Sequence, residues 1–467
     1  MRATQRLPFA AEAGACCFAQ MPIPDGFDVT ERRRALGLER QWVIALAGMA
    51  SLAVAMGIGR FAFTPLLPMM LHDQVMTLPE ASWLASANYL GYLLGAVFCT
   101  FQPMLRQHFG PAGRAPAVDA TVWVRTGLAA TCMLTLAMAL PFPTVWPALR
   151  FAAGVASAFV FVHTSGWCLA QLALLNQPTM GGMIYTGPGA GIVLSGLLAS
   201  GMVTLERSAA TGWLVFGVLA IVLTALAWRV FRDSADTTVM AAALKAVPLY
   251  EPTSMPQSSM SQAAHSGGNE IAALTLAYGL AGFGYIITAT FLPVIARAAL
   301  PESAWLDLFW PIFGIGVVAG AVLSTRIAAA RDKRLVLAGC YLVQAVGVAV
   351  NIWLPTLTGF ALGSVMLGLP FTAITFFAMQ EVRRLRPLAA PSFMGLLTAM
   401  YGLGQIAGPP LAAQLILRSG PGAGFRLSLE IASGALLAGA MLLGLMARIF
   451  PRTPGARPEP VGSGRRV

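Results

Sequence analysis

A single arginine, Arg60, stands in an apolar stretch that runs from Met56 to Met70. A charged side chain in the middle of a membrane costs about 3 kcal/mol or more, so it usually faces the protein interior or an aqueous cavity. The planar, permanently charged guanidinium of arginine can hold a carboxylate or a phosphate through two parallel hydrogen bonds. Arg60 is therefore a candidate for binding an anionic ligand.

Arg150 is a second arginine inside an apolar segment, and it lies at a similar depth if the two segments cross the membrane in opposite directions. Several interpretations are open. The two guanidinium groups face one cavity and hold an anion between them, or each pairs with an acid such as Glu206 or Asp307, or each extends toward the headgroups.

His163 is the candidate for proton coupling, because an imidazole ordinarily titrates near pH ~6.5. The alternative is a neutral histidine that hydrogen-bonds to a neighbouring helix. Thirteen residues separate it from Arg150, which at about 100° per residue puts the two side chains roughly 140° apart on a straight helix. The sequence therefore argues against a combined site.

Four polar side chains in later apolar segments complete the candidate substrate site. They are Tyr285, Thr288, Thr372 and Gln405. A pocket for a small molecule needs a few placed polar groups among apolar walls. Each of these side chains alone can equally serve as a hydrogen bond between helices.

Acidic residues are scarce in the apolar segments. Glu381 lies near the end of one segment and is followed by Arg383, Arg384 and Arg386, which predicts a salt-bridge network. No acid is predicted at the centre of a cavity-lining helix, where a cation site would need one. This shortage disfavours an exporter of cations and favours an anionic or neutral solute.

These residues need a membrane-spanning scaffold to position them. The chain has 467 residues, of which 57% are hydrophobic and 10% are charged, with a mean hydropathy of +0.72. Soluble domains carry about 25% charged residues, and about 20 apolar residues make one spanning helix. The predicted fold class is an all-α polytopic membrane protein with twelve transmembrane helices. The predicted spans are about 42–67, 82–104, 121–141, 145–171, 180–204, 212–231, 271–296, 304–326, 335–354, 357–382, 391–417 and 427–448.

Basic residues set the predicted orientation. Of the 30 Lys and Arg residues, about 23 fall in the tails and loops of one side and about 4 in the loops of the other. This asymmetry predicts that both termini lie in the cytoplasm, and it accounts for the net charge of +11. The 28 arginines against 2 lysines point to a bacterial source, so the predicted location is the bacterial inner membrane. A nucleic-acid partner is disfavoured, because no basic surface domain interleaved with aromatic residues is present.

The predicted spans divide six and six around a polar linker. The expected parts are a disordered N-terminal tail, a first bundle, a cytoplasmic linker, a second bundle and a C-terminal tail, over 1–40, 41–231, 232–270, 271–450 and 451–467. The tail lacks the continuous apolar region of a signal peptide, and translation can equally begin at Met21. None of the six cysteines has the spacing of zinc ligands, so no metal or other cofactor is indicated.

The two predicted bundles carry the same landmarks, which recur 225 residues apart. Gly57, Gly59, Leu67 and Pro68 correspond in this way to Gly282, Gly284, Leu292 and Pro293, and Tyr285 corresponds to Arg60. By the same logic, Phe151 to Gly154 resembles Phe360 to Gly363. Two halves that repeat in the same orientation are the organisation of parallel-repeat transporters.

At these residues the chain resembles the major facilitator superfamily over residues 41–450, and more narrowly its YbfB/YjiJ-type branch. The resemblance rests on 57–68, 85–95, 149–159, 279–287 and 401–409, the first of which reads Gly-Ile-Gly-Arg-Phe-Ala-Phe-Thr-Pro-Leu-Leu-Pro. It implies a secondary transporter with two six-helix bundles, alternating access and a central cavity lined by helices one, four, seven and ten. It does not imply a substrate.

The chain departs from the superfamily's loop motif. Relatives carry an aspartate four residues after a glycine, whereas here Gly95 is followed by Cys99 and Gly320 by Ser324. The aspartate supports a conformational latch in those relatives. Glycines and prolines are expected where helices bend or pack closely, and the candidate hinge residues are Gly57, Gly59, Pro65, Pro68, Gly187, Pro188, Gly282, Gly284, Pro293, Gly408 and Pro409.

The sequence thus predicts a monomeric secondary active transporter, not an enzyme, that moves a small anionic organic solute with protons across a bilayer. Two alternatives stay open. One is an efflux antiporter for drugs or other hydrophobic compounds, motivated by 22 methionines and 25 phenylalanines. The other is a membrane sensor that binds a solute without moving it.

Overall fold

The structure is a computed structural model that describes residues 29–109, 119–177, 180–231, 257–300, 303, 305–327, 332–386 and 390–451. Every regular element in these ranges is a helix. Contacts group residues 1–40 as one unit and residues 41–467 as another, and the fold described below is that of the second unit.

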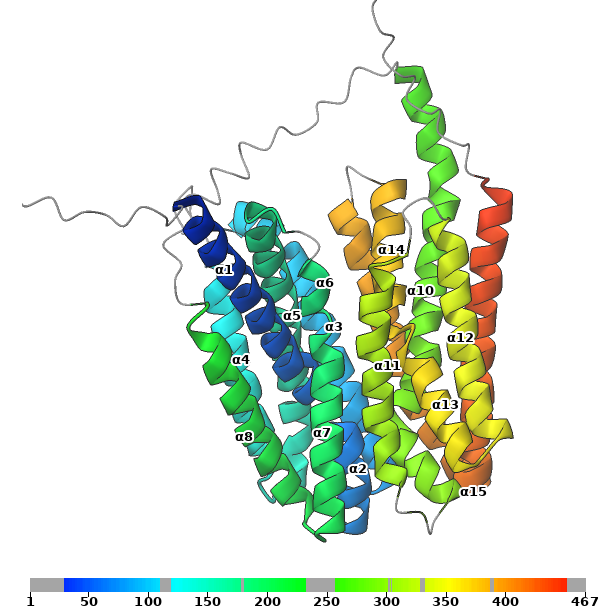
Figure 1. Ribbon diagram of the computed structural model, residues 1–467. Coiled ribbons are helices and arrows are strands. Elements are labelled where there is room, and N and C mark those ends of the chain that lie inside the picture. Colours follow the sequence, from blue (N-terminus) through cyan, green and yellow to red (C-terminus); the bar gives the residue numbers. More distant parts are fainter. Residues whose placement is uncertain are drawn as a thin grey trace, which may run out of the picture. The chain divides into compact units, whose positions relative to one another are not determined.

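The elements follow one another along the chain as in Figure 1. They are α1 (Val29–Leu52), η1 (Ala53–Ile58), α2 (Phe63–His72), α3 (Leu78–Phe109), α4 (Ala120–Ala137), η2 (Pro143–Val145), α5 (Trp146–Leu174), α6 (Gly181–Ile184), α7 (Gly187–Thr204), α8 (Ala209–Trp228), α10 (Gln257–Ala299), η5 (Leu306–Leu308), α11 (Phe309–Ser324), α12 (Lys333–Trp353), α13 (Leu357–Gly368), α14 (Phe371–Leu385) and α15 (Ala390–Ile449). The first half below means α1 to α8, and the second half means α10 to α15.

The number of membrane spans follows from the helix lengths. Within the described residues, 11 helical stretches are long and apolar enough to cross a membrane. The last, Phe393–Ile449, has 57 residues, which at 1.5 Å per residue is about 86 Å against a hydrocarbon core of about 30 Å. It is interrupted at Gly420, which has φ 79° and ψ 166°, a conformation open almost only to glycine. The chain folds back there, because Gly424 packs against Ile416. This stretch is therefore two spans, and the predicted twelve-helix fold is confirmed.

Capping side chains fix where several spans begin. Asp119 accepts a hydrogen bond from the first turn of α4, Ser208 from α8, Asp332 from α12 and Thr356 from α13. Each cap satisfies a backbone N–H that has no partner within its helix.

Two helix starts differ from the boundaries expected from sequence. The structure describes residues 29–40 as helical within α1, and residues 257–270 as helical within α10, where a disordered tail and a linker were expected. Apolarity predicts where a helix enters the bilayer, but a helix can continue past that boundary into water. The remainder of the tail, the linker up to residue 256, Met21 and the C-terminal tail from residue 452 lie outside the described residues.

Close helix contacts repeat between the halves. In the first half, Gly154 of α5 packs so tightly on α3 that a Cβ there would lie 2.1 Å from the Asn88 carbonyl oxygen. In the second half, Gly368 of α13 packs in the same way on α11, with its Cβ position 2.3 Å from the Phe313 carbonyl oxygen. Asn88 and Phe313 are 225 residues apart, the spacing of the landmarks in the first and seventh spans.

These contacts correct one alignment made from sequence. The equivalent of Gly154 is Gly368, 214 residues later, whereas the match of Phe151 to Gly154 with Phe360 to Gly363 was wrong by five residues. Gly363 packs instead against the amide of Asn351, whose oxygen would lie 2.2 Å from a Cβ. Short Phe and Gly patterns recur by chance in apolar helices, and only the partner helix defines the register.

One hydrogen bond joins two equivalent positions directly. The Thr64 hydroxyl donates to the carbonyl of Ala289 at 3.0 Å, and the two residues are 225 apart. Where two repeats are related by a two-fold axis, a residue touches its own equivalent only near that axis. The pseudo-symmetry axis of the two halves therefore passes close to this contact.

Candidate functional site at the junction of the two halves

The first spanning helix is irregular next to Arg60. In the π-helical turn η1, backbone N–H groups donate to the carbonyl five residues earlier, as Gly59 N–H does to the Val54 carbonyl at 2.8 Å. A regular helix resumes only at Phe63. Single π-helical turns are rare and occur frequently at functional sites, and irregular backbone at membrane depth needs partners from within the protein.

Arg150 supplies those partners. Its Nη1 donates to the Gly59 carbonyl at 3.1 Å and its Nη2 to the Arg60 carbonyl at 2.9 Å. The side chain is only 2% exposed, and Asn88 of α3 donates to the Arg150 carbonyl at 2.9 Å. Both terminal nitrogens are engaged and Nε is unpartnered, so this geometry favours a supporting role for Arg150 over the direct anion contact expected from sequence.

Arg60 lies where the two halves meet. Its Nη2 donates to Oε1 of Gln405 on α15 at 2.5 Å. Gln405 in turn donates through Nε2 to the hydroxyl of Tyr285 on α10. Three residues predicted from sequence thus form one hydrogen-bonded chain, and its two ends are the equivalent positions of the repeat.

The charge of Arg60 has no acidic partner in the described part of the chain. The residue is 4% exposed, and its Nε has no hydrogen-bond partner. The guanidinium carbon lies 4.0 Å from the ring centre of Tyr92 and 5.3 Å from that of Tyr89. Such cation–π contacts stabilise a desolvated cation by about 2 kcal/mol, but they do not neutralise it.

Aromatic rings from both halves surround this charge. Tyr285 stacks on Tyr401 with ring centres 5.7 Å apart and meets the edge of Phe371 at 5.2 Å. Phe371 also contacts Phe61, which adjoins Arg60, at 6.0 Å. We call Phe61, Tyr92, Tyr285, Phe371 and Tyr401 the central aromatic cluster. Three of its members, Tyr92, Phe371 and Tyr401, are only partly buried, so part of each side chain remains accessible.

Two predicted threonines flank the cluster. Thr288 is buried one turn beyond Tyr285 on α10, and Thr372 follows Phe371 on α14 and is partly exposed. Neither hydroxyl has a hydrogen-bond partner in the structure. An unpaired buried hydroxyl costs free energy, so both are available to a polar group of a ligand.

His163 belongs to another neighbourhood. Its Nε2 lies 3.8 Å from Sγ of Cys99 on α3, and its ring stacks on Trp123 of α4 with centres 5.7 Å apart. Arg150 instead faces Phe63 and Trp213. The two side chains therefore leave α5 toward different helices, as their thirteen-residue separation predicts.

The expected hinge glycines are sites of close packing. A Cβ on Gly57 would lie 2.5 Å from Gly191, one on Gly187 would lie 2.3 Å from the Met49 carbonyl oxygen, and one on Gly282 would lie 2.3 Å from that of Tyr401. Gly59, Gly284 and Gly408 meet other side chains within 2.7 Å in the same way. The prolines differ among themselves, since Pro188 opens α7 whereas Pro68, Pro293 and Pro409 lie inside helices. Pro65 lies in the first turn of α2, and a hinge role for any of these residues stays a prediction.

A separate ion network occupies the linker face, by which we mean the end of the bundle where α8 ends and the second half begins. Arg334 is fully buried and binds Glu270 at 3.0 Å and Asp332 at 2.8 Å. Arg384 binds Glu381 at 2.7 Å, which confirms the predicted salt bridge of Glu381. Arg334 was not predicted from the sequence as the centre of this network, because its only signal there is its place among the basic residues that follow the eighth span.

Asp307 is not the partner of either central arginine. It pairs with Arg297 at 2.5 Å. This pairing excludes Asp307 as an acidic partner of Arg60 or Arg150. The sequence alone did not indicate which basic side chain lies nearest to Asp307.

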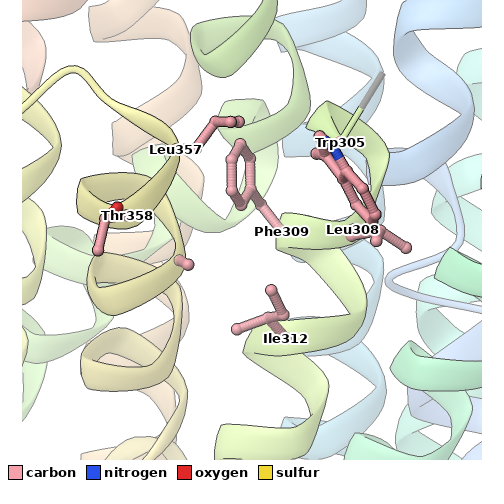
Figure 2. Close-up of a pocket in the computed structure, with 7 residues that line it drawn as sticks. Trp305, Leu308, Phe309, Ile312, Leu357 and Thr358 are labelled. Atoms are coloured by element: carbon pink, nitrogen blue, oxygen red, sulfur yellow. The ribbon is translucent and has the colours of Figure 1, made fainter. Parts of the chain in front are cut away.

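An apolar groove of about 310 Å³ lies away from these polar residues, between the start of α11 and α13 (Figure 2). It is lined by Trp305, Leu308, Phe309, Ile312, Leu357, Thr358 and Ala361. Trp305 is 62% exposed, and no lining residue is charged. Its composition suits contact with lipid chains better than binding of a polar solute.

The twelve apolar helices and the buried polar junction between two repeated halves define a multi-pass membrane transporter of the MFS fold. Residues 52–444 match the family described as "Uncharacterised MFS-type transporter YbfB", so the chain belongs to that family. A crystal structure of a point mutant of the nucleoside transporter NupG is similar, with a TM-score of 0.62 and 14% identity over 86% of this chain and 99% of that one. At that identity the likeness shows the fold alone. No curated protein matches the chain significantly.

Proposed function

We propose that this transporter is a secondary active carrier of a small anionic organic solute, coupled to protons, in the bacterial inner membrane. One observation carries the proposal. Arg60 is a buried cation with an unpartnered Nε and no acidic partner among the described residues, at the junction of the two halves. A carboxylate at Nε would supply the missing counter-charge and form two parallel hydrogen bonds.

In this proposal the two halves, residues 41–231 and 271–450, move as bundles about the junction. The bond from Arg60 to Gln405 joins one half to the other, so an anion that competes for Arg60 changes how strongly the halves hold together. The excess of Lys and Arg in the tails and in the loops on one side supports a cytoplasmic linker face. His163 stays the candidate for proton coupling, although its contacts with Cys99 and Trp123 lie on other helices than Arg60.

The NupG likeness gives weaker support for a nucleoside as the solute. A nucleoside is neutral and would leave the charge of Arg60 uncompensated. Export of lipophilic cations is the other candidate, and the lack of an acidic residue near Arg60 in the described ranges disfavours it, because a cation would meet a like charge.

The test is ligand-induced thermal stabilisation of the purified protein, followed by uptake into proteoliposomes with an imposed pH gradient. The panel contains carboxylates, nucleosides and lipophilic cations, with Arg60→Gln as the variant. The control is Arg426→Gln, which alters an arginine that is exposed in its pair with Glu430. We expect carboxylates to raise the melting temperature of the wild type and the control but not of Arg60→Gln.

Stabilisation by lipophilic cations alone, unchanged in Arg60→Gln, would overturn the anion proposal and support the exporter. A solute that binds but does not accumulate in vesicles under any gradient would favour the sensor.

A further inference from the structure

The charge at the junction fits one carboxylate and not two. Arg60 offers Nε, which is unpartnered, and Nη2, whose acceptor is the neutral amide oxygen of Gln405. Arg150, the other arginine at this depth, also has an unpartnered Nε, but both of its terminal nitrogens donate to the backbone carbonyls of Gly59 and Arg60. A second carboxylate could form two parallel hydrogen bonds with Arg150 only by competing with these carbonyls, and a buried carbonyl left unpaired is costly.

The surfaces around this charge are flat and aromatic. The central aromatic cluster supplies rings from both halves, and Tyr92, Phe371 and Tyr401 keep accessible surface. Planar rings pack on such surfaces in offset or edge-on geometry, which favours an aromatic ligand over a saturated one of equal area by about two- to tenfold. An aliphatic acid would gain the charge pairing but not this preference.

Besides the phenol hydroxyls of the cluster and the Gln405 amide, a few buried polar atoms near the cluster residues have no hydrogen-bond partner. The hydroxyls of Thr288 and Thr372 and the side-chain oxygen of Asn88 are the unpartnered ones nearest in the chain to cluster residues. One or two polar substituents on a ring would be satisfied.

We propose that the substrate class is an aromatic monocarboxylate, a planar ring with a single carboxylate. This inference rests on the anion-transporter function proposed above. The carboxylate binds the Nε and Nη2 edge of Arg60 and displaces the Gln405 amide, while the ring packs among Tyr92, Phe371 and Tyr401.

The experiment is calorimetric titration of the full-length purified protein with four probes. Benzoate is the aromatic monocarboxylate, cyclohexanecarboxylate is its non-planar match, benzamide is its neutral match, and terephthalate carries two carboxylates. We expect benzoate to bind at least about threefold more tightly than cyclohexanecarboxylate and at least about tenfold more tightly than benzamide or terephthalate.

Two variants locate the effect. Phe371→Leu should bring the affinity ratio of benzoate to cyclohexanecarboxylate close to one, whereas Phe142→Leu, at an exposed position, should leave the ratio unchanged. Arg60→Gln should abolish binding of both carboxylates. If a variant does not fold, the ratios among the four probes on the wild type still decide the proposal.

Equal binding of benzoate and cyclohexanecarboxylate, with both lost in Arg60→Gln, would overturn the aromatic class and leave the anion transporter standing. Tighter binding of terephthalate than of benzoate would overturn the inference that the substrate carries a single carboxylate. Binding of no carboxylate at all would overturn the inference and the proposed function together.

Discussion

The two halves of the repeat bury their arginines in different ways. In the first half, Arg60 and Arg150 lie deep in the bundle and bond to an amide and to backbone carbonyls, with no carboxylate partner among the described residues. In the second half, Arg334 lies at the linker face and bonds to Glu270 and Asp332. The second half has Tyr285 where the first has Arg60, and its helix α10 runs through that position without interruption.

Arg334 is thus a structural cation whose acidic partners are complete, whereas Arg60 is a cation that is free to bind an anionic ligand. A buried ion pair whose partners are complete stabilises a conformation when intact and gains nothing from a ligand. An uncompensated buried cation is costly and is relieved by a bound anion. The irregular backbone of the first helix is also stabilised by a buried arginine. The Gly59 and Arg60 carbonyls, which follow the π-helical turn, accept their hydrogen bonds from Arg150.

The largest effect is expected at the complete network. Arg334→Met removes the buried cation that Glu270 and Asp332 share, so the free energy of unfolding should fall by about 3–5 kcal/mol. Thermal and urea unfolding in detergent measure this change. Arg426→Met, which removes one partner of an exposed pair, should cost at most about 0.5 kcal/mol. Equal effects of the two changes would show that the linker-face network is not a structural unit.

A smaller loss is expected for the arginine that supports the first helix. Arg150→Met leaves the carbonyls of Gly59 and Arg60 unpaired, at about 1–3 kcal/mol for each, offset in part because an uncompensated buried charge is removed. The matched change is Ser364→Ala at the equivalent position of the second half, where the hydroxyl bonds only to Phe360 of its own helix. That change should be nearly neutral, and a neutral Arg150→Met would contradict the supporting role.

The repeat itself predicts a pair of equal effects. A Cβ at Gly154 or at Gly368 would meet a backbone carbonyl at 2.1 or 2.3 Å, so each Gly→Ala change should destabilise by about 1–3 kcal/mol. Gly201→Ala is the control, because nothing lies within 4 Å of its Cβ position and alanine favours a helix. If Gly368→Ala were tolerated as well as Gly201→Ala while Gly154→Ala was not, the register set by the contacts would be wrong.

Much of the fold could be predicted from the sequence, because the bilayer imposes a length and a composition on each span. The twelve helices and the 225-residue spacing followed from apolar runs and from glycine and proline positions. From the sequence, Arg60, Gln405 and Tyr285 could be assigned to one site, but their hydrogen bonds to one another could not be predicted. Gln405 is 345 residues from Arg60 and 120 from Tyr285, and such distant partners are set by helix packing. The roles of Arg150 and Arg334 could not be separated, because both are arginines near predicted helix ends and only their partners distinguish them.

The smallest effect is expected where the halves touch on the pseudo-symmetry axis. Thr64→Val removes the hydroxyl that donates to the Ala289 carbonyl, which should cost about 0.5–1.5 kcal/mol. The matched control is Thr126→Val, whose hydroxyl bonds within its own helix at an exposed position. If the two halves move about the junction as proposed above, this bond stabilises the state in which α2 and α10 touch, so Thr64→Val should also shift the population toward the state in which these helices separate. Distances between spin labels on the two helices measure that shift, and an unchanged distribution would mean that this bond does not hold the halves together.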